Sequence, residues 1–166
     1  MQTGIYHIPS NGDVTVTFPK KFRTKPIVIL SAHGNSGNSE ALLVEDPQED
    51  SFKARMITYS CSWETGYMHW IAIESDFVDP TNRIKLGVKN VGGNGDWTIT
   101  FDKAMAKPPV VLLTGLGNND HSTSCLVGDP TTQSFKARLI HCSGAWETGK
   151  SHWIAIEKDS FDIFGK

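Results

Sequence analysis

Two segments of the chain combine an aromatic side chain with a carboxylate inside one expected turn. Positions 59–66 read Tyr-Ser-Cys-Ser-Trp-Glu-Thr-Gly, and positions 142–149 read Cys-Ser-Gly-Ala-Trp-Glu-Thr-Gly. An aromatic ring can stack on the apolar C–H side of a sugar, and carboxylates and hydroxyls can form directed hydrogen bonds with sugar hydroxyl groups. We therefore expect the two segments to bind carbohydrate through Tyr59, Trp63, Glu64, Trp146 and Glu147.

Two polar loops offer further hydrogen-bonding groups. Positions 34–39 read Gly-Asn-Ser-Gly-Asn-Ser, and positions 117–122 read Gly-Asn-Asn-Asp-His-Ser. Binding residues concentrate on loops that a rigid scaffold positions, and each copy also has an Asp in an Asn-Gly-Asp turn. The additional candidates for sugar contacts are Asn35, Ser39, Asn118, Asp120, His121 and Ser122, together with Asp13 and Asp96.

A purely structural interpretation of these segments stays open. Trp-Glu-Thr-Gly also fits a hairpin connection whose Gly takes a positive φ and whose Trp packs on a sheet. The polar loops are also typical of exposed connections that bind nothing. Asn-Gly-Asp is by itself a strong turn signal.

The candidate residues recur because the whole chain is one unit written twice. A shift of 83 positions aligns residues 1–83 with residues 84–166 without a gap, and about 37 of the pairs are identical. The densest matches are Ser-Phe-Lys-Ala-Arg at 51–55 and 134–138, and His-Trp-Ile-Ala-Ile-Glu at 69–74 and 152–157. Gene duplication explains such a repeat, and only two copies of this length argue against a solenoid.

Strands are the elements that must position these residues. Positions 14–18 and 97–101 alternate apolar residues with Thr, whereas 27–30 and 110–113 are short apolar runs that follow a Pro. Further strands are expected at 42–44, 52–59 and 69–74 and in the second copy. We predict an all-β fold of two tandem antiparallel β-sandwiches of about six strands each, spanning 1–79 and 84–166, with the join within 77–91.

The last strand of each copy carries apolar or aromatic side chains on both faces. A unit of about 80 residues cannot bury both faces in its own core, and exposed apolar patches usually mark interfaces. We therefore expect a repeat–repeat or subunit interface at His69, Ile71, Ile73, His152, Ile154 and Ile156.

Composition argues against several classes of partner. The formal net charge of -2 and the pI near 6.3 do not favour nucleic acid, and no apolar run is long enough for membrane insertion. The start of the sequence has no signal-peptide pattern. Because the three cysteines have no Cys at the equivalent position of the other copy, reduced thiols and cytoplasmic synthesis are expected, with release by an unconventional route left open.

Catalysis and bound metals are not expected either. No Cys/His group has zinc spacing, and neither an Asp-x-Asp-x-Asp calcium loop nor a Gly-x-Ser-x-Gly elbow occurs. Glu64 and Glu74 could form a glycosidase pair, but an 83-residue unit offers little depth for a cleft that excludes water. The sequence therefore predicts a protein that is not an enzyme and has no cofactor.

The order Thr-Val-Thr-Phe, Lys-Pro-Ile-Val-Ile-Leu, Ser-Phe-Lys-Ala-Arg and His-Trp-Ile-Ala-Ile-Glu resembles the H-type lectin domain of snail agglutinins and discoidins. The resemblance covers 14–74 and 97–157. It implies six-stranded sandwiches that assemble as trimers or hexamers and bind galactose or N-acetylgalactosamine near subunit boundaries.

The family's binding residues transfer to this chain only in part. Asp13 and Asp96 match its acidic position, and Tyr59 matches its aromatic position, where the second copy has Cys142. Ser39 and Ser122 stand where the family has an Arg, and Ser lacks the directed hydrogen bonds of a guanidinium.

Three classes of function follow from the sequence. The first is a lectin or agglutinin that binds glycans of glycoproteins or glycolipids multivalently, as a homo-oligomer. The alternative is a structural or attachment module, such as a tail-fibre or assembly component, which uses the sandwich for oligomerisation. A protein-binding module that uses the loop ends is a third possibility.

Overall fold

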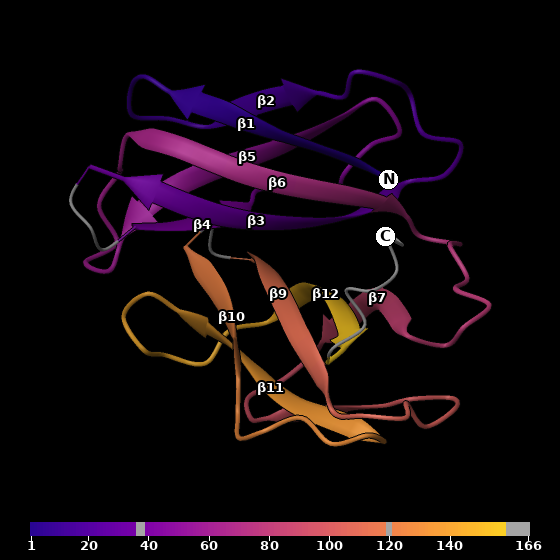
Figure 1. The fold of residues 1–166 in the computed structure, drawn as a ribbon. Coiled ribbons are helices and arrows are strands. Elements are labelled where there is room, and N and C mark those ends of the chain that lie inside the picture. The colour runs from indigo at the N-terminus through magenta and orange to yellow at the C-terminus, as the bar shows by residue number, and fades with distance from the viewer. Residues whose placement is uncertain (36–38, 119–120, 159–166) are drawn as a thin grey trace.

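The computed structural model describes residues 1–35, 39–118 and 121–158, which form twelve β-strands (Figure 1). The first repeat contains β1 (Gln2–Ile8), β2 (Val14–Thr17), β3 (Pro26–Gly34), β4 (Ser39–Leu43), β5 (Ser51–Thr58) and β6 (Gly66–Glu74). The second contains β7 (Ile84–Val91), β8 (Trp97–Thr100), β9 (Pro109–Gly117), β10 (Ser122–Leu126), β11 (Ser134–His141) and β12 (Gly149–Glu157). Within the described ranges, no helix has the length and apolar character needed to cross a membrane.

Each repeat folds into its own pair of three-stranded antiparallel sheets. The strand orders are β1-β6-β3 and β2-β5-β4 in the first repeat, and β7-β12-β9 and β10-β11-β8 in the second. The register is repeated as well, since Ala72 lies opposite Val28 and Ala155 lies opposite Val111. The predicted fold class, all-β with two tandem sandwiches of about six strands each, is confirmed.

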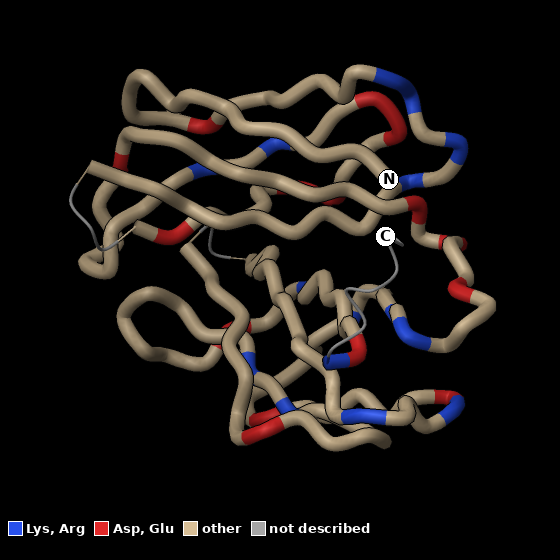
Figure 2. Tube along the Cα trace, viewed as in Figure 1, with Lys and Arg blue, Asp and Glu red and all other residues tan. Residues whose placement is uncertain are grey.

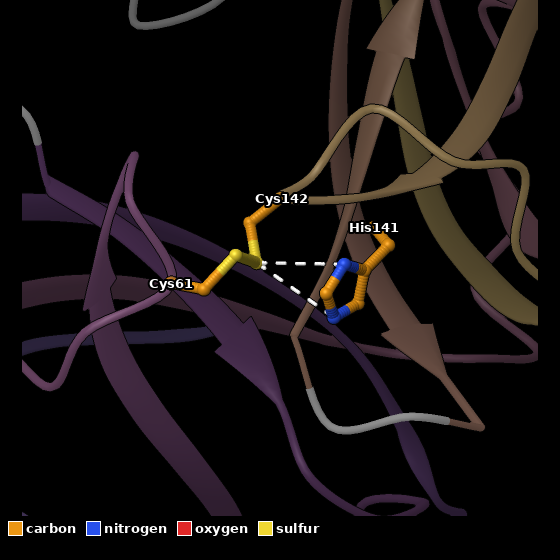
Figure 3. A group of neighbouring side chains, drawn as sticks. All are labelled: Cys61, His141 and Cys142. Atoms are coloured by element: carbon orange, nitrogen blue, oxygen red, sulfur yellow. Dashed lines mark hydrogen bonds between the residues drawn. A yellow bond between two sulfur atoms is a disulfide. The ribbon is translucent and has the colours of Figure 1, made fainter.

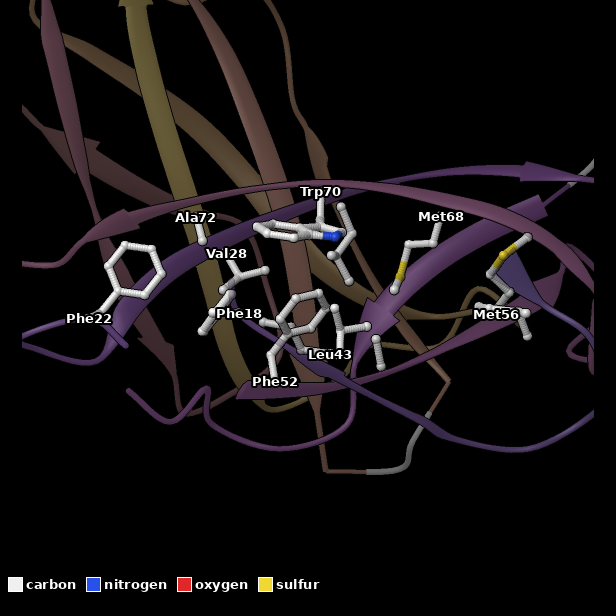
Figure 4. Packing of buried hydrophobic residues seen from close by; sticks show 13 residues of the cluster. Phe18, Phe22, Val28, Leu43, Phe52, Met56, Met68, Trp70 and Ala72 are labelled. Carbon is white, nitrogen blue, oxygen red and sulfur yellow. The ribbon is translucent and has the colours of Figure 1, made fainter. Parts of the chain in front are cut away.

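Each sandwich has its own core, built from the side chains that alternate toward its interior. In the first repeat the rings of Phe18, Phe52 and Trp70 lie with their centroids 5.5 to 5.7 Å apart (Figure 4). The same three positions meet in the second core, as Phe101, Phe135 and Trp153. Burial of large aromatic side chains from both sheets therefore holds each sandwich closed.

The strands expected from the sequence do not include the first strand of each repeat, β1 and β7. β1 was not identified, and β7 lies inside the segment 77–91 that was assigned to the join. Both are edge strands that contain a Gly, which weakens the strand pattern. The glycines are needed because an indole lies over them: a Cβ added to Gly4 would lie 2.6 Å from Trp70 Cζ2, and one at Gly87 would lie 2.9 Å from Trp153 Cζ2.

The two sandwiches share a third apolar cluster at the junction between the repeats. The outer face of the β7-β12-β9 sheet lies against β3, and β9 and β10 also contact β4. The buried members of the cluster are Ile27, Ile29, Ile73 and Ile154, and the partly buried ones are Ile71, Ile84, Leu86 and Ile156. The Lys150 ammonium and the Asp46 carboxylate form an ion pair across the same junction.

Side chains of the second repeat satisfy the free edge of β3. This strand ends the β1-β6-β3 sheet, so alternate N–H groups point away from β6. The N–H of Val28 donates to His152 Nδ1 at 3.2 Å, and the N–H of Leu30 donates to Thr114 Oγ1 at 2.9 Å. Both acceptor side chains are only 2% exposed. The junction therefore replaces water at an edge strand that would otherwise stay open.

The residues expected at an interface take up different positions. Ile71, Ile73, Ile154 and Ile156 belong to the shared cluster, and His152 is buried beside it. His69, which has the same position in the first repeat as His152 in the second, is exposed. The duplication is therefore symmetric in sequence, whereas the packing of the two repeats is not.

We predict that Gly4→Ala and Gly87→Ala each lower the free energy of unfolding by about 1–3 kcal/mol, because the new methyl group overpacks against a core indole. The measurement is urea unfolding followed by fluorescence. Gly92→Ala is the control, since a Cβ there would meet no atom within 4 Å. A Gly4→Ala variant as stable as Gly92→Ala would contradict the role assigned to Trp70.

His152 gives the junction a pH dependence. Burial lowers the pKa of its imidazole from the ordinary 6.5 to about 4, while the Asp46 carboxylate acts to raise it and the Lys150 ammonium to lower it. The unfolded chain therefore binds this proton more readily than the folded chain does. The contribution of neutral His152 to the free energy of unfolding is complete above pH 6.5 and is lost as the pH falls toward 4. Protonation of Nδ1 also removes the acceptor for Val28 N–H.

We predict that this one group lowers the free energy of unfolding by about 2 kcal/mol between pH 7.5 and pH 5. His152→Asn should remove that part of the pH dependence, whatever its effect on stability at neutral pH. His69→Asn is the matched control and should keep the wild-type slope. Urea unfolding at both pH values gives the comparison, and equal slopes for wild type and His152→Asn would refute the assignment.

Candidate functional site

The same three side chains lie together in each repeat: an Asp, an Arg and a Trp, of which Arg55 is buried. Arg55 pairs with Asp13 at 2.8 Å, and its guanidinium carbon lies 4.7 Å from the centre of the Trp63 ring. In the second repeat the group consists of Asp96, Arg138 and Trp146, with an ion pair of 3.0 Å and a ring distance of 5.2 Å. A guanidinium over an indole is a cation–π contact, and the carboxylate neutralises the cation.

Local strand geometry explains why these groups form. Asp13 comes just before β2, and β2 pairs with β5, where Val14 lies opposite Ala54, the neighbour of Arg55. After β5 the chain turns back, and Trp63 forms an isolated bridge with Ile57, just as Trp146 does with Ile140. The two indoles remain 37% and 41% exposed. Each sandwich therefore presents an indole on its surface with an Arg over the ring.

Sequence reasoning missed the two arginines of these groups. Arg55 and Arg138 end the identical Phe-Lys-Ala-Arg blocks, which were interpreted as strand residues only. A usable signal was present, because each block carries Lys and Arg two positions apart, hence on the same face of the strand. Lys53 and Lys136 do lie near the same carboxylates, Asp13 at 3.6 Å and Asp96 at 3.1 Å.

The two predicted glutamates point inward. Glu64 is 8% exposed and Glu147 is 4% exposed, and each carboxylate accepts the N–H of the following Thr at 3.0 and 2.9 Å, respectively. Gly66 and Gly149 take φ values of 145° and 146°, as the turn interpretation requires. The Trp-Glu-Thr-Gly segments therefore follow the turns and lead into β6 and β12, and their buried carboxylates stabilise the backbone.

The predicted polar-loop residues support the same turns. Asn35 Nδ2 donates to Thr65 Oγ1 at 2.9 Å, and Asn118 Nδ2 donates to Thr148 Oγ1 at 2.8 Å. The Ser39 side chain lies over Gly34, and the buried Ser122 lies over Gly117. Asp120, also a predicted candidate, lies outside the described residues. Asn35 and Asn118 therefore join the loops to the Trp-Glu-Thr-Gly segments.

The first Trp lies at the boundary between the repeats. The His121 ring, from the second repeat, is 6.4 Å from the Trp63 ring and 5.8 Å from the His141 ring. Tyr59, the remaining predicted aromatic residue, is 75% exposed. The two Trp groups therefore share a local design but have different neighbours.

A disulfide joins the two repeats beside this boundary. Cys61, in the turn after β5, is bonded to Cys142, in the turn after β11, with the Cα atoms 5.6 Å apart (Figure 3). The prediction of reduced thiols is therefore wrong for these two residues. That prediction considered only equivalent positions of the two repeats. Cys61 and Cys142 are not at equivalent positions, and the junction between the repeats brings them together. Cys125 is a free thiol.

The same place offers a set of metal-ligand atoms. Cys61, His141 and Cys142 each have one such atom within 4.8 Å of the others. Figure 3 shows the His141 ring beside Cys142 Sγ, at 3.7 Å from Nδ1 and 3.8 Å from Nε2. Metals bind the thiolate form of cysteine, and the two sulfurs are bonded to each other. In this form the group is therefore a covalent link between the repeats.

Comparison with known families corrects the resemblance drawn from the sequence. The family described as "Putative tail fiber protein gp53-like, C-terminal" matches residues 1–73, which includes all of the first sandwich except the last residue of β6. The assignment to the H-type lectins is therefore wrong. It depended on strand and core residues, which sandwiches of this size share for reasons of packing. The comparisons give no matching curated protein and no matching solved structure.

We predict that the disulfide stabilises the chain by about 4 kcal/mol, because it closes a loop between residues 81 positions apart. Cys61→Ser/Cys142→Ser should lower the free energy of unfolding by that amount, whereas Cys125→Ser serves as the control. Thiol titration in denaturant should find one thiol before reduction and three after it. Denaturant is needed because burial raises the pKa of the Cys125 thiol and slows its reaction. Three thiols in the unreduced protein would exclude the bond.

Proposed function

We propose that this chain is a structural or attachment module of the tail-fibre type and that it catalyses no reaction. The match of the tail-fibre family to residues 1–73 carries the proposal, because it spans nearly the whole first sandwich. The second sandwich repeats the same strands, cores and Asp–Arg–Trp group, which extends the similarity in form to the rest of the described chain.

The packing suits a mechanical role. Two cores, a shared isoleucine cluster and a covalent link between the repeats make a stiff unit from two small sandwiches. The described turns hold their polar side chains in internal hydrogen bonds, as Glu64 and Asn35 show. Such a unit can transmit force along a fibre and can display the exposed indoles of Trp63 and Trp146 to a surface.

The carbohydrate hypothesis has less support from the geometry. An Arg lies over each exposed indole, which leaves only part of the ring for a sugar, and the neighbouring carboxylates of Glu64 and Glu147 are buried. Attachment through these surfaces therefore enters the proposal without a named sugar.

The proposal predicts that the chain is a component of virus-like particles made by the organism that encodes it. Purified particles should contain it by mass spectrometry, and antibodies against the chain should place gold at the tail fibres in electron micrographs. Antibodies against an unrelated particle protein control for the labelling. If particles are produced and lack the chain, the proposed function fails.

A second measurement separates attachment from a purely structural role. The purified chain should compete with particles for adsorption to host cells if it forms the attachment surface, and Trp63→Ala/Trp146→Ala should then compete at least tenfold less well. Tyr59→Ala is the matched control for loss of an exposed aromatic side chain. Labelled fibres without any competition would assign the chain to the structure of the fibre alone.

A further inference from the structure

The turns that the disulfide joins carry histidines as well as cysteines. Cys61 lies in the turn after β5 of the first repeat, whereas His141 ends β11 of the second repeat and Cys142 follows it (Figure 3). A second histidine, His121, comes directly before β10, and its carbonyl accepts the N–H of Cys142 at 2.9 Å. Its ring lies beside the ring of His141. Two sulfurs and two imidazoles from three segments of the chain are therefore close together at the boundary between the repeats.

The spacing of these side chains is close to that of the ligands in a tetrahedral zinc site. Zn–S bonds of about 2.3 Å and Zn–N bonds of about 2.0 Å place neighbouring ligand atoms about 3.3 to 3.8 Å apart. Cys142 Sγ lies 3.7 Å from His141 Nδ1 and 3.8 Å from its Nε2, and the ligand atoms of Cys61, His141 and Cys142 lie within 4.8 Å of one another.

The second histidine fits the same geometry. The bond lengths of a tetrahedral zinc site place the centres of two bound imidazole rings about 5 Å apart. The ring centres of His121 and His141 are 5.8 Å apart. The four side chains, here called the Cys₂His₂ group, therefore have separations that suit one zinc ion once the two sulfurs are no longer bonded to each other.

The backbone of Cys61 places a thiol where glycine would fit better. Its φ is 62°, in the left-handed region that is sterically unfavourable for a residue with a Cβ. The equivalent residue of the second repeat is Gly144, with a φ of 84°. Both turns have the same hydrogen bond, from Cys61 N–H to the Thr58 carbonyl and from Gly144 N–H to the His141 carbonyl. Such a conformation persists where other contacts hold it, and the bond to Cys61 Sγ is a contact that Gly144 lacks.

The members of the Cys₂His₂ group share one property, the lack of a Cys or His at the equivalent position of the other repeat. The equivalent residues of Cys61, His121, His141 and Cys142 are Gly144, Asn38, Thr58 and Tyr59, respectively. The duplication therefore did not supply the group, which lies where the turn after β5 meets the turn after β11. A disulfide needs the two cysteines alone. The two histidines need a separate explanation, and a metal ion supplies one.

The charges around the group also suit a divalent cation. Positions 58–63 and 141–146 contain no Lys, Arg, Asp or Glu, so the tube is tan along both turns (Figure 2). Two thiolates and two neutral imidazoles balance the charge of Zn²⁺, and structural zinc sites use this ligand set. All four side chains are partly buried, so an ion can reach them from the solvent.

We propose that the Cys₂His₂ group binds one Zn²⁺ when its cysteines are reduced, and that the disulfide is the oxidised form of the same site. Zinc links the repeats in a reducing environment, and the disulfide links them in an oxidising one. Both forms hold the turn after β5 against the turn after β11. The inference goes beyond the proposed function, because it concerns how the two repeats of one chain are joined.

Both steps between these forms are balanced reactions. Zinc binding displaces one proton from each thiol. In oxidation by a small disulfide of the glutathione type, one protein thiolate attacks a sulfur of that disulfide and releases a small thiolate. The other protein thiolate then attacks the mixed disulfide, forms the bond between Cys61 and Cys142 and releases the second small thiolate. Two electrons pass to the small disulfide, and Zn²⁺ leaves because no thiolate remains to bind it.

The first test measures metal binding by the intact chain. The chain is reduced with a phosphine, because a dithiol would itself bind zinc. Reduced wild type should bind one equivalent of Zn²⁺ in competition with a chromogenic chelator, whereas oxidised wild type should bind none. Co²⁺ in place of Zn²⁺ should show thiolate-to-metal charge transfer and the visible bands of a tetrahedral ion. A folded, reduced wild type that binds no zinc overturns the proposal, as does bound cobalt without charge transfer.

Variants of single ligands test the composition of the site. Cys142→Ser should raise the dissociation constant for Zn²⁺ at least about a hundredfold, and His121→Gln and His141→Gln at least about tenfold each, since even outer-shell partners change metal affinity by about tenfold to hundredfold. Cys125→Ser and His69→Gln are the matched controls and should bind zinc like wild type, because the first removes a free thiol of β10 and the second an exposed imidazole of β6. Circular dichroism verifies that each variant is folded. Wild-type affinity in either ligand-histidine variant would exclude the Cys₂His₂ group as the site.

Oxidation of the zinc-loaded chain tests whether the two forms share one site. Oxidised glutathione should release one Zn²⁺ for each disulfide formed, while the thiols titrated in denaturant fall from three to one. Zinc should also raise the midpoint of thermal unfolding of reduced wild type and leave that of oxidised wild type unchanged. Zinc that stays bound after the disulfide has formed would contradict the shared site. These measurements use the purified chain, so their outcome is separate from that of the particle experiments.

Discussion

The capping of the β3 edge by the second repeat is the interaction on which the rest of the structure depends. An edge strand presents N–H groups that need hydrogen-bond acceptors, and a small sandwich has few residues that could cover them. His152 and Thr114 meet that need with neutral acceptors on a strand face, while isoleucines exclude water around them. Both acceptors belong to the second repeat, so the β3 edge depends on that repeat for its hydrogen bonds. In turn, the outer face of β7-β12-β9 depends on the first repeat to cover its isoleucines.

This one contact makes two units of the same fold unequal. Ile27 and Ile29 become core residues, whereas their counterparts Val110 and Leu112 stay at the surface. The junction also brings the turns after β5 and β11 together, which allows Cys61 and Cys142 to bond although neither has a Cys at the equivalent position. The asymmetry of the pair is thus a consequence of the packing at the junction.

The Asp–Arg–Trp group of the candidate site is present in both repeats, whereas its neighbours differ between them. The Asp–Arg–Trp group depends only on the pairing of β2 with β5 and on the return of the chain after β5, so it forms in both repeats. Its surroundings depend on the junction, since His121 reaches Trp63 from the other repeat. The tail-fibre family matches the first sandwich, and a stiff double sandwich with exposed indoles fits a structural or attachment role.

The sequence by itself determined the duplication, the all-β class and most of the strands, because alternation and turn residues are local signals. It did not reveal β1 and β7, where Gly4 and Gly87 weaken the pattern to make room for an indole from another strand. Only the tertiary structure decided which of two equivalent histidines is buried, which cysteines bond and which carboxylates point inward. These outcomes depend on contacts between residues far apart in the chain, and identical residues such as His69 and His152 carry no local sign of them.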